Sequence, residues 1–149
     1  MRFYWCDVFT KEKFGGNPLV VFPNAQELTT EKMQKIAKEF NLSETVFVFP
    51  PTNTLNCCRL RIFTPNHELP FAGHPTIGTA YILAATGQIP LEKEITKVIF
   101  EEGVGEIPIT IFSKNKKPIY TQFTAAKLPE IGPEPPSINI LATSWSFPC

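Results

Sequence analysis

Short stretches of β-branched and aromatic residues, some of them alternating with polar residues, recur along the chain and predict a strand-rich protein. The predicted strands lie at 3–9, 19–22, 45–49, 55–63, 96–100, 107–112 and 118–123. Turn-forming residues at 102–105 and 114–116 join the last three strands as hairpins. Because the strands come in runs rather than in alternation with helices, the pattern predicts an α+β fold with mostly antiparallel pairing.

Two other segments have helical patterns of different kinds. From Thr30 to Phe40, apolar residues recur at helical spacing, Thr29 or Thr30 can cap the start, and Asn41 can end the helix. The segment at about 75–86 carries no charge and is apolar on every side. Its roughly 12 residues would span only about 18 Å, too little to cross a bilayer. The sequence therefore predicts a surface helix packed on the sheet and a central buried helix with the sheet wrapped around it.

The entrance to the buried helix carries candidate chemistry. Ala72, Gly73 and His74 lead into it, and Pro75 suits the first helical position. N–H groups in the first turn lack internal partners and sit at the positive end of the helix dipole, which favours anions. Gly73 would let the backbone approach a ligand, with the His74 imidazole beside it. An ordinary polar cap with a hydrogen-bonded histidine is the alternative interpretation.

Glu44 is a second candidate. It stands where the amphipathic helix gives way to the strand at 45–49, a place from which a side chain can face a cleft. An exposed carboxylate in a turn is the alternative, and the residues alone leave both open.

Composition narrows the class of protein. Lys plus Arg and Asp plus Glu each number 14, so no basic surface for nucleic acid or anionic membrane is expected. The N-terminus does not resemble a signal peptide. The four cysteines show no metal-binding spacing, and neighbouring Cys57 and Cys58 would point to opposite faces of a strand. We therefore expect a cytoplasmic protein with reduced thiols and no metal.

The C-terminal segment, 126–149, is rich in proline. Five prolines fall between Pro129 and Pro148, a composition typical of a linker or extended segment. We expect a folded domain at 1–125 followed by this linker-like tail.

Three motifs together resemble the phenazine biosynthesis-like protein family, whose fold is related to that of diaminopimelate epimerase. They are FGGNPLVVF at 14–22, NLSETVF at 41–47, and RIFTP at 61–65 continuing to ELPFAGHPT at 68–76. Each motif alone is weak, but their order and spacing are specific, and the resemblance covers about residues 1–125.

The resemblance implies a fold of two similar halves, of which this chain would be the first: a curved sheet around a central helix. It also implies cofactor-independent proton transfer that isomerises or epimerises a small carboxylic acid. Glu44 would be the catalytic general acid/base. The substrate-binding residues that the resemblance implies are Ser43, Gly73, His74, Pro75 and Thr76.

Family members are about twice as long, and their second half supplies an acidic residue and a second helix start. We expect this second domain to be absent here. Two hypotheses follow. Either a second copy completes the site, as a homodimer of an isomerase, or the chain is a non-catalytic domain that binds small acids or another protein.

Overall fold

Eight strands form one curved sheet in the computed structural model, which describes residues 1–125 and 132. The expected tail at 126–149 lies outside the described residues, apart from Gly132. The strands are β1 (Tyr4–Val8), β2 (Asn17–Phe22), β3 (Thr45–Phe49), β4 (Cys58–Phe63), β5 (Glu68–Leu69), β6 (Ile95–Glu102), β7 (Gly105–Lys114) and β8 (Lys117–Phe123). The sheet order is β1-β2-β3-β4-β6-β7-β8, and the short strand β5, which was not predicted, pairs with β4. The predicted α+β class and mostly antiparallel pairing are confirmed.

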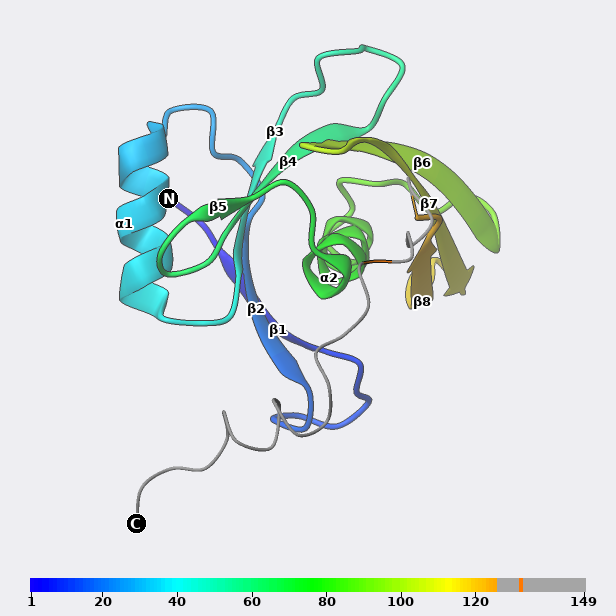
Figure 1. The fold of residues 1–149 in the computed structure, drawn as a ribbon. Helices are drawn as coiled ribbons and strands as arrows, with labels where there is room; N and C mark the ends of the chain where they lie inside the picture. The colour runs from blue at the N-terminus through cyan, green and yellow to red at the C-terminus, as the bar shows by residue number, and fades with distance from the viewer. Residues whose placement is uncertain (126–131, 133–149) are drawn as a thin grey trace.

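Two helices occupy opposite faces of this sheet: α1 (Thr30–Phe40) and α2 (Gly73–Ala85). Figure 1 shows the sheet curling around α2, with α1 on the outer side of β1–β4. Each helix lies in a crossover between parallel neighbours, α1 between β2 and β3, and α2 between β4 and β6. Both crossovers are expected to be right-handed, and both move in the same direction along the sheet. Because β3 and β4 run antiparallel, the two crossovers start from strands of opposite direction. The helices α1 and α2 therefore lie on opposite faces of the sheet.

The predicted ends of both helices are close to the observed ones. Thr29 caps α1, and Asn41 ends it in the left-handed conformation at φ 51°. Helix α2 begins at Gly73, so the prediction that Pro75 takes its first position is wrong by two residues. Pro75 is still within the first turn, where an N–H would have no intrahelical acceptor, and the helix loses no bond there.

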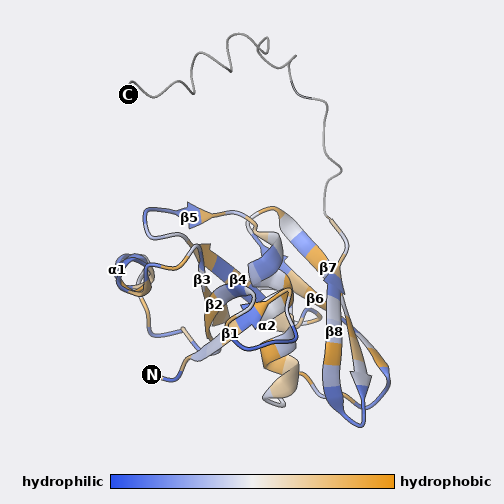
Figure 2. Ribbon diagram, turned by 90° about the horizontal axis from the view of Figure 1, so that it is seen from below, coloured by the Kyte–Doolittle hydropathy of each residue, from blue (hydrophilic) through white to orange (hydrophobic). Residues whose placement is uncertain are grey.

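Each face of the sheet has its own apolar core. On the inner face, α2 packs Ala80 and Leu83 against strands from both ends of the sheet. On the outer face, α1 packs Met33 and Ala37 against a group of phenylalanines, and Phe22 and Phe47 of this group stack with ring centroids 5.0 Å apart. Figure 2 shows the difference: α1 is largely hydrophilic in colour, whereas much of α2 is pale to orange. No helix among the described residues is long and apolar enough to span a membrane.

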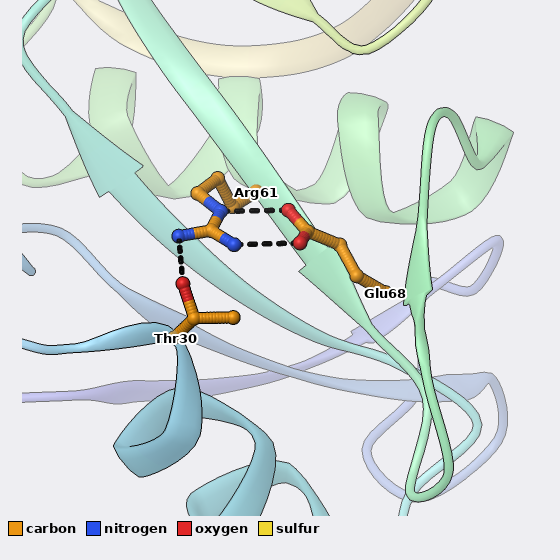
Figure 3. Close-up of polar contacts among 3 residues, drawn as sticks. All are labelled: Thr30, Arg61 and Glu68. Carbon is orange, nitrogen blue, oxygen red and sulfur yellow. Dashed lines mark hydrogen bonds and ion pairs between the residues drawn. The ribbon is translucent and has the colours of Figure 1, made fainter.

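An ion pair fixes the connection that leads into α2. Arg61 of β4 donates from Nε and Nη2 to the two carboxylate oxygens of Glu68 on β5, each at 2.6 Å (Figure 3). Its Nη1 also donates to Thr30 Oγ1 at the start of α1, at 3.0 Å. Because the pair is bidentate, it holds β5 in one orientation, four residues before α2 begins.

Candidate active site

The start of α2 has no side-chain cap. Ala72 is the N-cap residue, in extended conformation, and makes no capping bond, whereas Thr29 of α1 accepts a hydrogen bond from the Lys32 N–H at 3.3 Å. The first bond of this turn runs from the Thr76 N–H to the Ala72 carbonyl, at 3.2 Å. Pro75 has no N–H, so the N–H groups of Gly73 and His74 remain without intrahelical acceptors at the positive end of the dipole.

Glu44 and His74 meet beside this turn. Glu44 Oε2 and His74 Nε2 are 3.3 Å apart, and their side chains are 17% and 10% exposed. Both atoms are buried and have no hydrogen-bond partner in the part of the chain that the structure describes, because the contact between them lacks hydrogen-bond geometry. Glu44 is therefore not an exposed turn residue. Buried polar atoms of this kind call for a functional or structural explanation.

Burial lowers the pKa of His74 below its ordinary value of 6.5, while the neighbouring Glu44 carboxylate acts in the opposite direction. The larger effect is burial, so the imidazole is mostly neutral at pH 7. A neutral imidazole has one donor and one acceptor nitrogen, which suits a group that exchanges a proton with its neighbour.

Packing does not explain why residue 73 is glycine. A Cβ atom at Gly73 would lie 3.4 Å from the Phe123 ring, an ordinary contact distance. At Gly78, by contrast, a Cβ atom would lie only 2.6 Å from Leu19 Cδ2, so close packing excludes a side chain there. Glycine at this position is compatible with close approach of a ligand to the backbone of the first turn.

The remaining predicted site residues have different environments. Ser43 is exposed, and its hydroxyl donates to Asn17 Oδ1 at 3.3 Å. Pro75 is buried. Thr76 is also buried, and its hydroxyl oxygen lies 2.8 Å from the Ala72 carbonyl oxygen and 2.7 Å from Glu102 Oε1. The roles of these three residues in substrate binding remain predictions.

Two residues near the site were not identified from the sequence. The Phe9 ring lies 6.4 Å from the His74 ring, is 75% exposed, and has a positive φ of 65°. Glu102 is only 9% exposed and contacts the first turn of α2 through Thr76. The sequence did carry a signal for Glu102. Strand alternation continued past Phe100 places it on the same inward face as Phe100.

No group of three or more His, Cys, Asp or Glu residues with the arrangement of a metal site occurs within the described part of the chain. Cys6, Cys57 and Cys58 are free thiols. The candidate chemistry of the site lies in the Glu44–His74 pair and the start of α2.

A sheet that curls around a central helix is a fold that also occurs among epimerases. At the level of fold alone, a hydroxyproline epimerase from Agrobacterium vitis aligns with a TM-score of 0.61 at 11% identity, over 73% of this chain and 38% of that one. The expected diaminopimelate epimerase-like half is thereby confirmed.

The chain belongs to the phenazine biosynthesis-like protein family, which matches residues 6–144. An uncharacterised isomerase from Mesorhizobium japonicum is 47% identical over 83% of this chain and 40% of its own length. The trans-2,3-dihydro-3-hydroxyanthranilate isomerase of Pseudomonas aeruginosa is 40% identical over 78% of this chain and 39% of its own. A Bacillus anthracis phenazine biosynthesis protein of this family has a TM-score of 0.65 at 34% identity, covering 77% and 38% of the two chains. This chain thus spans about 40% of the length of the curated relatives that it matches.

Proposed function

We propose that this chain carries the proton-transfer and carboxylate-binding half of a cofactor-independent isomerase or epimerase that acts on a small carboxylic acid. The observation that carries the proposal is the Glu44–His74 pair, with two buried, unpartnered polar atoms 3.3 Å apart beside an uncapped helix start. The family's isomerases support the reaction class.

The proposed chemistry follows from the charges that develop. A substrate carboxylate accepts hydrogen bonds from the Gly73 and His74 N–H groups at the start of α2. Glu44 removes a proton from carbon and returns it to another position or face, and His74 assists this transfer. The negative charge that develops on the substrate is stabilised by the same helix start.

Two further expectations belong to this proposal. A second copy of the chain would face the site as a homodimer and supply groups that one copy does not. Phe9 and Phe14, 75% and 92% exposed on the connection between β1 and β2, would then lie at the contact. A cytoplasmic location is also proposed, in keeping with the free thiols.

The test uses the full chain and trans-2,3-dihydro-3-hydroxyanthranilate, the compound named for the Pseudomonas aeruginosa relative. In deuterated water, wild type should incorporate solvent deuterium into this compound as it isomerises. Glu44→Gln should abolish incorporation with an unchanged circular dichroism spectrum. The matched control is Glu39→Gln, which makes the same change of charge on the exposed side of α1 and should leave incorporation unchanged. Equal exchange in wild type and Glu44→Gln would refute the role of Glu44.

The second candidate function is binding of a small carboxylic acid, or of another protein, without catalysis. It is favoured by the observation that the described residues place a single carboxylate, Glu44, against His74, so one copy supplies only one acid/base group on that side of the site. Calorimetry distinguishes the two functions. Binding of the compound that is lost in His74→Ala, with no isomerisation by wild type at any protein concentration, would support the binding domain and overturn the isomerase proposal.

A further inference from the structure

The Thr76 hydroxyl has two close oxygen neighbours and only one hydrogen. Its oxygen lies 2.8 Å from the Ala72 carbonyl oxygen and 2.7 Å from Glu102 Oε1, both within hydrogen-bond distance. A carbonyl oxygen can only accept, so the contact with Ala72 uses the Thr76 hydrogen. The contact with Glu102 then needs a hydrogen from the carboxyl group. The two contacts are satisfied together when Glu102 is protonated.

We propose that Glu102 is a positioning residue for the carboxylate-binding turn, acting in its protonated form through Thr76 on the peptide between Ala72 and Gly73. The proposal rests on the proposed function, because it assigns Glu102 to the anion site at the start of α2. It goes beyond that function by naming a residue that touches neither the substrate nor the Glu44–His74 pair.

The action on Gly73 follows from peptide geometry. In a trans peptide, the C=O and N–H bonds point in opposite directions. The Ala72 carbonyl is held by two groups of Thr76, its N–H at 3.2 Å and its hydroxyl at 2.8 Å. Fixing this carbonyl therefore fixes the direction of the Gly73 N–H on the opposite side of the same peptide. The contacts from Glu102 through Thr76 thus set the direction of the Gly73 N–H, one of the two N–H groups of the turn without an intrahelical acceptor.

The same turn is thus flanked by two acidic side chains with different tasks. His74 and Thr76 are two positions apart, about 200° around the helix, so Glu44 and Glu102 approach from different sides. A charged Glu102 would place a second negative charge behind the anion site and draw the Thr76 hydrogen away from Ala72. The neutral form avoids both effects.

The surroundings of Glu102 favour the neutral form. Burial raises its pKa to about 7 and outweighs the Thr76 hydroxyl, which acts in the opposite direction. Cys58, on the neighbouring strand β4, is an ionisable group that interacts electrostatically with Glu102. The pKa of the Cys58 thiol is raised well above the usual range. The adjacent Glu101 instead accepts hydrogen bonds from the Thr52 and Asn53 N–H groups at 2.7 Å. Neither Cys58 nor Glu101 changes charge near pH 7.

The test follows the Gly73 amide by NMR in the full chain, with benzoate as the carboxylate probe. In wild type, the Gly73 amide shift and the Glu102 carboxyl carbon should titrate together with a midpoint near pH 7. In Glu102→Gln, the amide side chain donates to Thr76 at every pH, and the Gly73 transition should disappear. Glu94→Gln, an exposed control with the same change of charge, should keep it. The His74 transition lies lower and should persist in all three proteins.

Benzoate affinity gives the second readout. Wild type should bind benzoate roughly three- to tenfold more weakly at pH 8 than at pH 6, the effect of one hydrogen bond, and Glu102→Gln should bind equally at both. A Gly73 amide without a transition near pH 7 in wild type, or with an unchanged transition in Glu102→Gln, would overturn the proposal. If the variant fails to fold, the wild-type titrations alone test the proposal, because the midpoints of the Gly73 amide and the Glu102 carboxyl carbon must agree. A Gly73 transition that depends on Glu102, without benzoate binding at any pH, would support the positioning role and overturn the carboxylate site.

Discussion

Replacing Glu102 by glutamine should change how the stability of the fold depends on pH. In the folded chain the pKa of Glu102 is raised from 4.5 to about 7 by burial. Between these two values the folded state holds a proton that the unfolded state has lost. The stabilisation is therefore complete below pH 4.5 and is lost as pH rises through 7. At about 1.4 kcal/mol per pH unit, this loss amounts to about 3 kcal/mol. Glutamine does not titrate and should remove this loss.

Urea denaturation followed by far-ultraviolet circular dichroism at pH 5, 6, 7 and 8 provides the measurement. The free energy of unfolding of Glu102→Gln minus that of wild type should rise by about 2.5 kcal/mol from pH 5 to pH 8, since part of the loss already occurs below pH 5 and all other titrations cancel in the difference. For the exposed control Glu94→Gln the difference should stay flat. A flat difference for Glu102→Gln would show that Glu102 is as ionised in the folded chain as in the unfolded one, and the reasoning from burial would fail.

Three other changes have defined outcomes. Glu44→Gln should lower the pKa of His74 further, because it removes the charge that opposes burial; an NMR titration of the imidazole would show an unchanged pKa if the pair were not formed. Gly78→Ala should destabilise the fold by about 1–3 kcal/mol in urea denaturation, since its methyl group would lie 2.6 Å from a buried side chain, while Gly73→Ala should fold almost as stably as wild type. Glu68→Gln should cost at most about 1 kcal/mol, an effect that shrinks in high salt, because the ion pair is partly exposed.

The sequence predicted the fold well where the pattern of residues was unambiguous. The central helix was identified because a charge-free segment, apolar on every side, has few other places in a globular protein. Its start was misplaced because proline favours the first helical position but is tolerated throughout the first turn. The strand at 68–69 was missed because two residues are too few to show alternation; its pairing with β4 is determined by tertiary contacts.

The site could be predicted only in part. Glu44 and His74 are 30 positions apart, and no spacing rule places them together; the family resemblance identified both, and the fold brings them within 3.3 Å. Glu102 lay outside the motifs and was assigned to a turn. Its role depends on a contact with Thr76, across the inner face of the sheet. The contact exists because β6 continues to Glu102. The sequence predicted that this strand ends at Phe100, so the contact was not foreseen.

Under the proposed function, the absence of a capping side chain at Ala72 is a compromise between stability and ligand binding. Ala72 has φ −154° and ψ 131°, a conformation that serine and aspartate adopt readily at helix caps. Aspartate here could accept the His74 N–H and stabilise the fold by about 1 kcal/mol. Under the proposed function, the same bond would occupy the His74 N–H that a substrate carboxylate needs, so the aspartate would compete with the substrate. Alanine forgoes that stability and keeps the helix start open, a pattern expected where selection acts on ligand binding and only a threshold of stability is required.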